Sequence, residues 1–518
     1  MHTDLNLMTP EQRIAAWWNN LDSRAKLTFF AALLWGLVCH GMMLTNKYSI
    51  HDDITFLHSI GATYESGRWM LGLISLAEQK LTASLHHSMP LVHGLFSLVC
   101  ISLFAAILVN LFRIRSKLLC VTLGCAMTAF PGVASLFGFM FTAPYYMAAL
   151  LATVLAAAAL CRRKNMLTWC LSVAVMTCAM GVYQAYIPVA IGILLLHFLL
   201  ARLDRPGDDW AHTIKTAIYY GSALLVTVLA YYVVNKLFLK VFDLQLNNYQ
   251  GISSMGREGL GVYLTRALLA YKAFFFPEQM VRASDALVVM GLKLPWKMLL
   301  ALDAVLLAVL FLRSWKERPW KALQVLAVSA LLPLTFGFAY VMGPDAHTLM
   351  IFGQCLIFAL TACLVQRLGM DKALFLRLVS LLLCLLLVLF PLVWCRYDNA
   401  LYMDLEMNQQ RTISWFNTLI TRIKSAEGYR DELPVSYVGR MEKQDLTFGV
   451  LTLFPYIWPY ESAPDLINDS GQIHFMEKWC GFWQMQVEFD HPDIASMPCY
   501  PDDGSIRVID DVIVVKFS

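Results

Sequence analysis

Charged side chains are scarce in this sequence of 518 residues. Asp, Glu, Lys and Arg make up 15% of the chain, hydrophobic residues make up 58%, and the mean hydropathy is +0.57. Ordinary globular domains carry roughly 25% charged residues. So low a content leaves too little polar surface for the three or four soluble domains that this length would otherwise suggest. The composition therefore excludes a soluble multidomain protein and indicates a polytopic membrane protein.

Several chemical motifs are also missing. The sequence has no P-loop, no dinucleotide-binding glycine fingerprint, no internal repeat and no basic run of the length that nucleic acid binding needs. Its Cys and His residues are not spaced as metal ligands, and the pair His86-His87 lacks a third and a fourth ligand. We therefore predict no cofactor, no metal ligand and no nucleic acid partner, and leave a divalent metal as an open alternative.

Disulfide-forming cysteines are few. The chain has 13 cysteines, and most of them lie inside apolar runs, where Cys packs as a small hydrophobic residue. Only Cys480 and Cys499 share a soluble region. They are the candidate disulfide if that region is periplasmic, and two free thiols are the alternative.

The net charge of +3 combines two regions of opposite sign. Residues 1–395 carry 30 Lys and Arg against 18 Asp and Glu, a net of +12, whereas residues 396–518 carry 10 against 19, a net of −9. The last long apolar run ends at this same point. We therefore predict a transmembrane body over residues 1–395 and a soluble acidic domain over residues 396–518.

Apolar runs long enough to span a bilayer occur eleven times, since roughly 20 helical residues cross about 30 Å of hydrocarbon. The predicted spans are 27–46, 90–112, 118–138, 140–160, 166–182, 185–201, 216–238, 296–313, 322–342, 347–366 and 373–395. The number of spans depends on two pairs of closely spaced runs, which meet at Gly138 and at Tyr183.

Basic residues in the connections predict the orientation. With a cytoplasmic N-terminus, the cytoplasmic connections hold Lys and Arg clusters such as those at 113–117 and 162–164, whereas the short opposite connections at 139–145 and 343–347 hold none. An odd number of spans then places the C-terminus outside the cytoplasm. We therefore predict a multi-pass membrane protein with a cytoplasmic N-terminus.

Three non-cytoplasmic segments are long enough to build a site: the external loops 47–89 and 239–295, and the C-terminal region 396–518. In the second loop, Tyr263–Pro277 has aromatic and Leu side chains interrupted by two cations, which predicts a helix lying in the membrane interface.

The C-terminal region combines helical and strand patterns. It begins with an amphipathic helix near Leu405–Ile423 and continues with short β-type runs such as Val435–Val438. A closing hairpin is expected to pair Ile506–Ile509 with Val512–Phe517. The predicted fold class is therefore a polytopic all-α membrane protein of about 11 transmembrane helices with a C-terminal periplasmic α/β domain.

The first external loop holds the residues best suited to chemistry. Two adjacent acids, Asp52 and Asp53, follow the first span, and Arg68 and Trp69 come about fifteen residues later. This pattern places a base and an anion-binding cation near a membrane surface, which suits chemistry on a lipid phosphate. The structural alternative is that one acid caps a helix starting near Ile54 and that Arg68 and Trp69 anchor that helix at the headgroups.

A series of short motifs resembles the Gtr-type glucosyltransferase family of the glucosyltransferase II kind. Those motifs are Asp52-Asp53, Ser66-Gly67-Arg68-Trp69, Tyr183-Gln184-Ala185-Tyr186, Asn399-Ala400-Leu401-Tyr402, Met497-Pro498, Pro501–Ile506 and Val514-Val515-Lys516. Each motif alone does not identify the family, but the order of the motifs together with the many-helix body is specific for it. The resemblance runs from about residue 50 to the last residue.

The resemblance implies transfer of glucose from undecaprenyl phosphate glucose to lipopolysaccharide O-antigen on the periplasmic face, a serotype-type modification. It also implies a layout similar to that of GT-C glycosyltransferases, whose first external loop carries an essential acid. That role falls on Asp52 or Asp53. We expect Asp53 to be the base and Asp52 to be a positioning group, and the reverse order stays open.

The proposed chemistry needs a carboxylate for the proton of the attacking hydroxyl and positive charge on the departing phosphate. No protein nucleophile is needed if the configuration inverts. The candidate phosphate ligands are the external cations Arg68, Lys80, Arg257, Arg266, Lys272 and Arg282. Arg offers a planar fork to phosphate oxygens and is the preferred type.

Sugar contacts are expected from Tyr183, Gln184 and Trp69, because aromatic rings stack on sugar faces and amides bind hydroxyls. Helix packing is the alternative for these three residues. The competing functions are a transporter or flippase of a lipid-linked sugar and a GT-C-type transferase or ligase for another sugar. Only Asp303 is a mid-span acid of the kind that a transporter would need.

Overall fold

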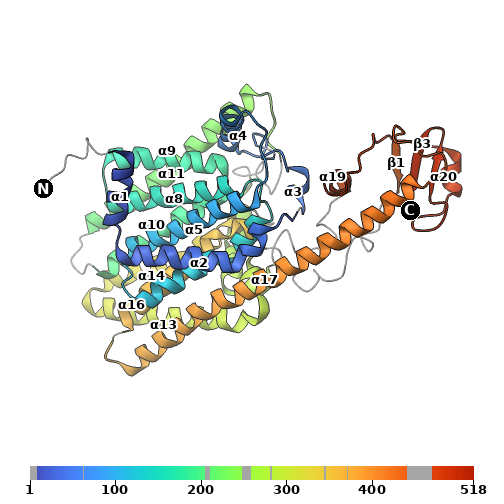
Figure 1. Ribbon diagram of the computed structural model, residues 1–518. Helices are drawn as coiled ribbons and strands as arrows, with labels where there is room; N and C mark the ends of the chain where they lie inside the picture. Colours follow the sequence, from blue (N-terminus) through green and yellow to red (C-terminus); the bar gives the residue numbers. More distant parts are fainter. Residues whose placement is uncertain are drawn as a thin grey trace.

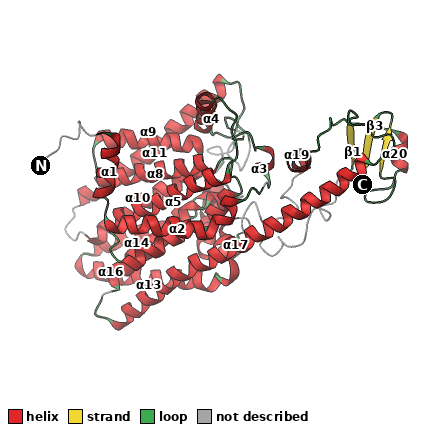
Figure 2. Ribbon diagram, viewed as in Figure 1, coloured by secondary structure: helices red, strands yellow, loops and turns green. Residues whose placement is uncertain are grey.

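The computed structural model describes residues 9–48, 50–61, 63–204, 210–247, 258–280, 283–343, 346–369, 371–439 and 469–518. These residues form a bundle of long helices, and one helix, α17 (Leu374–Lys424), projects from the bundle and carries a small sheet near its far end (Figure 1 and Figure 2). We refer to the end of the bundle from which α17 emerges as the projecting end.

The bundle is built from helices in nearly continuous succession. In chain order they are α1 (Pro10–Asn20), α2 (Ser23–Thr45), α3 (Asp52–Thr55), α4 (Trp69–Thr82), α5 (Pro90–Phe112), α6 (Lys117–Thr128), α7 (Pro131–Phe137), α8 (Ala143–Arg162), α9 (Met166–Val182), η2 (Gln184–Tyr186), α10 (Ile187–Asp204), α11 (Trp210–Val241), α12 (Leu260–Phe275), η4 (Pro277–Gln279), η5 (Ser284–Gly291), α13 (Lys293–Glu317), α14 (Pro319–Phe336), α15 (Ala339–Met342), η6 (Thr348–Met350), η7 (Phe352–Cys355), α16 (Leu356–Leu368) and α17.

Among the described residues, nine helices are long and apolar enough to cross a membrane, and the protein is thus a polytopic, mainly helical membrane protein. Two further apolar helices, Met166–Val182 and Phe352–Leu368, are shorter. The eleven predicted spans fall on these nine and two helices, and the number that cross the bilayer stays a prediction. The predicted run 118–138 is interrupted, because α6 ends at Thr128 and Pro131 starts α7. Pro has no N–H to continue the first helix and is favoured at the first position of a new one.

Small residues allow α2 and α6 to approach closely. A Cβ atom added to Gly124 of α6 would lie 2.9 Å from the carbonyl oxygen of Thr28 and 3.2 Å from Ala32. Inside a bilayer the lipid is as apolar as the side chains, so helix association depends on close van der Waals packing rather than on leaving water. Glycine at position 124 is therefore a packing requirement of this bundle.

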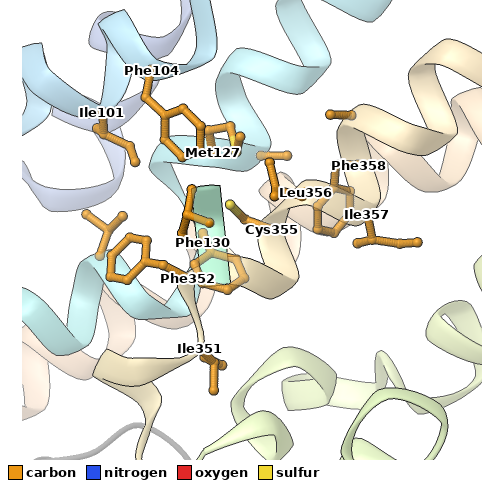
Figure 3. Close-up of a cluster of buried hydrophobic side chains, with 14 of the residues drawn as sticks. Ile101, Phe104, Met127, Phe130, Ile351, Phe352, Cys355, Leu356, Ile357 and Phe358 are labelled. Carbon is orange, nitrogen blue, oxygen red and sulfur yellow. The ribbon is translucent and has the colours of Figure 1, made fainter. Parts of the chain in front are cut away.

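Large aromatic side chains fill the middle of the bundle where α5, α6, α7, η7 and α16 meet. Figure 3 shows Phe104, Met127 and Phe130 pointing toward Phe352 and its neighbours on η7 and α16. The rings of Phe130 and Phe352 have centroids 5.7 Å apart, and both side chains are fully buried. This packing fixes the start of η7, and thereby the connection just before it at the projecting end.

Helix α17 is longer than the sequence indicated. The last predicted span, 373–395, and the predicted amphipathic helix near Leu405–Ile423 are parts of one 51-residue helix. At about 1.5 Å per residue the helix is roughly 76 Å long, more than twice the hydrocarbon thickness. The change of composition at residue 396 therefore marks a change of surroundings, not a helix end. The division into two domains at that residue stays a prediction.

Side chains of the predicted motif Asn399-Ala400-Leu401-Tyr402 hold α17 against α2. The Asn399 amide donates to the carbonyl oxygens of Val38 and Cys39, at 3.1 and 3.3 Å. One turn later, the Tyr402 hydroxyl lies 2.8 Å from Nδ1 of His40, which is fully buried. The motif thus acts as a polar contact between two helices.

Helix α12 matches the predicted interfacial segment over Tyr263–Pro277. It exposes Leu264 and Leu268 and buries Ala270 and Phe274 against the bundle. Its apolar outer face is the pattern expected of a helix beside lipid.

The C-terminal part of the described chain contains a three-stranded sheet of order β1-β3-β2, with strands β1 (Val435–Val438), β2 (Ile506–Ile509) and β3 (Val512–Lys516). Strands β2 and β3 form the predicted hairpin, with Ile509 opposite Val512, and β1 is the predicted Val435–Val438 run. The turn residues Asp510 and Asp511 both have positive φ, as a two-residue type I′ turn requires.

The sheet packs with two helices, α19 (Asp469–Cys480) and α20 (Pro492–Ser496), and with the far half of α17. Phe416 of α17, Phe475 of α19 and Val515 of β3 share one buried apolar cluster. Ile54 of α3 belongs to the same cluster and is 1% exposed. The C-terminal region therefore packs directly on the short helix that carries the two loop acids (Figure 1).

Candidate active site

The two adjacent acids of the first loop point into different surroundings. Both lie in α3, a single turn at the projecting end. The Asp52 side chain is 41% exposed and pairs with Nδ1 of His51 at 3.0 Å. The Asp53 side chain is 2% exposed, accepts a hydrogen bond from the Ser88 hydroxyl at 2.8 Å and forms an ion pair with Lys47. Asp52 is therefore the carboxylate that an incoming molecule can reach.

The backbone just before Asp52 is strained. His51 has a φ of +47° and a ψ of −131°. Such a conformation costs a residue with a side chain about 1–3 kcal/mol and persists only where the surrounding contacts hold it. The turn at His51 directs the Asp52 side chain outward while Asp53 and Ile54 are buried.

The loop that carries Arg68 is fixed by two side chains from other helices. The Gln184 amide donates to the Ser66 carbonyl at 3.0 Å and to the Tyr231 hydroxyl at 2.8 Å. The Tyr231 hydroxyl in turn donates to the Gly67 carbonyl at 3.0 Å. Gln184, predicted as a sugar contact, thus donates one hydrogen bond to the loop backbone and one to the tyrosine that also holds this loop.

Replacing Gly67 with alanine is expected to displace this loop. Gly67 has a φ of +73°, and an added Cβ would lie 2.5 Å from the Tyr231 hydroxyl and 2.7 Å from the Gln184 amide nitrogen. Both the backbone conformation and the space exclude a methyl group. We expect the variant to unfold at a lower temperature and to lose Arg68-dependent activity by tenfold or more, since a 1 Å misplacement costs on the order of 10²-fold.

Gly259→Ala is the matched control, because a Cβ at Gly259 meets nothing within 4 Å and its φ is negative. The measurement is the thermal unfolding midpoint in detergent together with the rate of sugar transfer. Unchanged values in Gly67→Ala would show that the loop tolerates the methyl group.

Arg68 lies over a pair of stacked tyrosines. Its guanidinium carbon is 5.8 Å from the ring centre of Tyr146 and 5.6 Å from that of Tyr183, and the two rings stack at 4.5 Å. Cation–π contacts of this kind orient a guanidinium and leave its N–H groups able to bind an anion. Tyr183, predicted as a sugar contact, thus supports Arg68 with its ring face. Its role toward a sugar stays a prediction.

Trp69, the third predicted sugar contact, is 5% exposed. Its ring stacks on Phe238 of α11 at 5.4 Å, and Tyr64 stacks on Phe242 of the same segment at 4.6 Å. These aromatic contacts dock the loop onto α11. The Trp69 indole nitrogen is buried and has no hydrogen-bond partner among the residues that the structure describes.

His347 connects the acidic turn with Arg68. Burial is the largest cause, and the electrostatic effects of Arg68 and His51 add to it, so that the pKa of His347 is lowered to about 3. Both of these residues are thus near enough to act on one buried imidazole. His347, Arg68, His51 and Asp52 form the group that we call the site cluster.

Protonation of His347 predicts a pH dependence of stability. Its pKa in the folded protein lies below the ordinary value of 6.5, so the unfolded chain binds more protons between about pH 3 and 6.5 and stability falls as the pH is lowered through this range. Each unit of depression corresponds to about 1.4 kcal/mol at most. His347→Gln should show a shallower fall of the unfolding midpoint between pH 7 and pH 4. Parallel curves for the two proteins would contradict this account.

The other predicted phosphate ligands lie elsewhere or are engaged. The Arg266 guanidinium is paired with both oxygens of Glu258, at 2.8 and 2.6 Å, whereas Lys80 and Lys272 are exposed side chains. Arg257 and Arg282 lie outside the described residues. None of the three described candidates besides Arg68, which are Lys80, Arg266 and Lys272, is among the groups whose charges act on His347.

Sequence reasoning missed several residues of this region. Lys47 and Ser88 were not predicted, although both bind Asp53, and neither were Tyr146 and Tyr231. The only available signal was that they all lie at predicted external ends of spans. His347 carries no sequence signal of a functional role, because nothing local links it to Arg68.

No group of three or more His, Cys, Asp or Glu side chains in the described part of the chain is arranged to hold a metal ion. Cys480 and Cys499 are both free thiols, half-buried and exposed respectively, so the structure has the second of the two predicted alternatives. Of the C-terminal aromatic residues, Phe482 is buried in the local core, whereas Trp483 is 69% exposed.

Comparison with known proteins gives one family. A family model described as glucosyl transferase GtrII matches residues 41–395, which is more than half of the chain and contains the whole site cluster. No curated protein and no solved structure matches the chain.

Proposed function

The chain belongs to the GtrII family of glucosyl transferases, and from this premise we propose that it moves glucose from undecaprenyl phosphate glucose to lipopolysaccharide O-antigen. Transfer takes place on the periplasmic face of a bacterial inner membrane, in a GT-C-like enzyme. The observation that supports this best is the site cluster, in which the exposed carboxylate of Asp52 pairs with His51, and His51 and Arg68 both act on the buried imidazole of His347.

In this proposal Asp52 is the general base. A base must come within about 2.6–3.2 Å of the proton that it removes. Asp52 is exposed enough for a sugar hydroxyl to approach, whereas Asp53 is buried and paired. The structure therefore favours the reverse of the order expected from the sequence, with Asp52 as base and Asp53 as the positioning group.

Arg68 binds the phosphate of the donor. The acceptor oxygen attacks the anomeric carbon, its proton passes to Asp52, and the bond from carbon to phosphate oxygen breaks with the electron pair leaving on the phosphate. The guanidinium fork stabilises the charge that develops there. One displacement of this kind inverts the configuration at the anomeric carbon and needs no protein nucleophile. His347, neutral at pH 7, adds a hydrogen-bonding group beside Arg68 without adding another charge.

The hydrophobic helices support a membrane-bound substrate. Nine long apolar helices and two shorter ones fit a body of eleven spans with a cytoplasmic N-terminus and a periplasmic C-terminus. In that orientation the projecting end is periplasmic, and a lipid-linked donor reaches Arg68 from the bilayer. The acidic C-terminal region then lies on the side of the acceptor polysaccharide.

The purified chain in lipid vesicles, incubated with radiolabelled polyprenyl phosphate glucose and O-antigen, tests the proposal. We expect labelled glucose to appear on the polysaccharide, with the linkage assigned by mass analysis. Movement of the labelled lipid across the vesicle without a new glycosidic bond would indicate a flippase instead. Transfer only from a donor with another sugar would keep the enzyme class and replace the glucose assignment.

A further inference from the structure

Lys47, Ser88 and Asp53 form a closed set of polar contacts beside the site cluster. Lys47 pairs with Oδ2 of Asp53, and Ser88 donates to Oδ1. The Lys47 ammonium also donates to the Ser88 hydroxyl at 2.9 Å. Both oxygens of the buried carboxylate are thus engaged, and each partner is itself held by the other.

The three residues come from three separate segments. Lys47 follows α2, Asp53 lies in α3, and Ser88 lies in the connection between α4 and α5. The Ser88 backbone N–H donates to the carbonyl of Leu57, just after α3, at 2.9 Å. The contacts of Asp53 therefore join the end of α2, the acidic turn and the start of α5.

The same junction reaches the projecting helix. The Gln409 amide of α17 donates to the Lys47 carbonyl at 2.9 Å, and Ile54, next to Asp53, is buried in the cluster built around Phe416 of α17. The end of α2, α3, the connection before α5 and the projecting helix α17 are therefore joined around Asp53. The strained His51 backbone lies directly between Lys47 and Asp53, so these contacts are suited to hold it.

We infer that Lys47 and Ser88 are positioning residues, which act through Asp53 to hold the His51-Asp52 turn in its outward conformation. The inference rests on the proposed function, because it assigns to the junction the orientation of the base Asp52. A buried carboxylate left without its cation is costly, so removing Lys47 disturbs the turn even though Lys47 does not touch the substrate. We expect the loss of these contacts to lower kcat rather than to raise the donor KM, because in the proposed mechanism the donor phosphate is bound by Arg68.

The test is a double-mutant cycle in the transfer assay with Lys47→Met, Asp53→Asn and the double variant. Each single variant is expected to lower kcat by about 10- to 100-fold, as a misplaced catalytic group does, with a smaller change in the donor KM. The double variant is expected to be no slower than the slower single variant, since both changes remove the same contact. Lys47→Arg should restore most of the rate.

Lys297→Met is the matched control. It removes a lysine near the start of α13 that pairs with Glu278 at 2.7 Å and is not a member of the site cluster, and it should leave kcat unchanged. Folding is followed in every variant by the thermal unfolding midpoint and by elution as a single species in detergent.

Two further measurements separate positioning from catalysis. In Asp53→Asn the acid limb of the kcat profile should persist, because the proposed base, Asp52, is unchanged. Loss of that limb together with a rate loss above about 10³-fold, while Lys47→Met stays active, would make Asp53 the base and overturn the inference. Multiplicative losses in the double variant would also overturn it. No transfer by the unaltered chain would instead count against the proposed function itself.

Discussion

Replacing Asp52 with asparagine is expected to lower kcat for glucosyl transfer by about 10²–10⁴-fold, the range contributed by a general base. Asparagine has nearly the same shape but cannot accept the proton of the attacking hydroxyl. The donor KM should change little, because the phosphate is bound elsewhere. The measurement is the initial rate at saturating donor, over a pH range that covers the acid limb.

Folding should be preserved in this variant. The Asp52 side chain is 41% exposed and forms its ion pair within the described residues with the neighbouring His51, so the unfolding midpoint is expected to stay close to that of the unaltered chain. Glu65→Gln is the control, since Glu65 is an exposed acid of the same loop whose backbone carbonyl, not its carboxylate, accepts a hydrogen bond from Asn247. An Asp52→Asn protein that transfers glucose at the full rate would remove Asp52 from the mechanism.

Replacing Arg68 with alanine is expected to lower kcat/KM for the donor by about 10²–10³-fold, as the loss of a charge-stabilising donor does in other active sites. The side chain is the one cation at the site cluster with a planar fork for phosphate oxygens. Arg68→Lys keeps the charge but not the planar fork, so its kcat/KM should lie between that of the unaltered chain and that of Arg68→Ala. Added guanidinium ion should restore part of the activity of Arg68→Ala, because it replaces the missing group.

Lys236→Met is the control for a lost cation on an aromatic ring. Lys236 lies 4.6 Å from the ring centre of Tyr232 on α11 and is exposed, so its loss should leave the donor kinetics unchanged. If Arg68→Ala binds and uses the donor normally, the phosphate contact must be sought among the other external cations. Arg257 and Arg282 would then be the first to test.

The sequence predicts much of this architecture because the relevant signals are local. The hairpin at Asp510-Asp511 and the strand Val435–Val438 occur as predicted, since alternating apolar residues and a tight turn specify them within a few residues. The apolar runs likewise match the long helices. The exception is α17, where a polar stretch follows an apolar one and the helix continues through Pro391 near the end of the apolar stretch.

The structure gives the predicted site residues contacts that the sequence did not indicate, and their roles stay predictions. The structure brings Asp52 and Arg68 to one end of the bundle, as the loop pattern suggested. It gives Gln184 and Tyr183 contacts that hold Arg68 and its loop, which the sequence could not distinguish from sugar contacts. The sequence does not distinguish a sugar contact from a structural contact, because a Gln amide and a Tyr ring can serve either role.

Hydropathy and charge are sums over neighbouring residues, and for that reason the sequence by itself determined the membrane class, the helical runs and the loop with two acids. Asp53 is buried against the side chains of Lys47 and Ser88, which lie 6 and 35 residues away from it in the sequence, whereas Asp52 stays exposed. The link between α2 and α17 depends on residues 362 positions apart. Only tertiary packing brings such residues together, so only the structure decided that Asp52 is the accessible carboxylate and that Arg68 has two tyrosines beneath it.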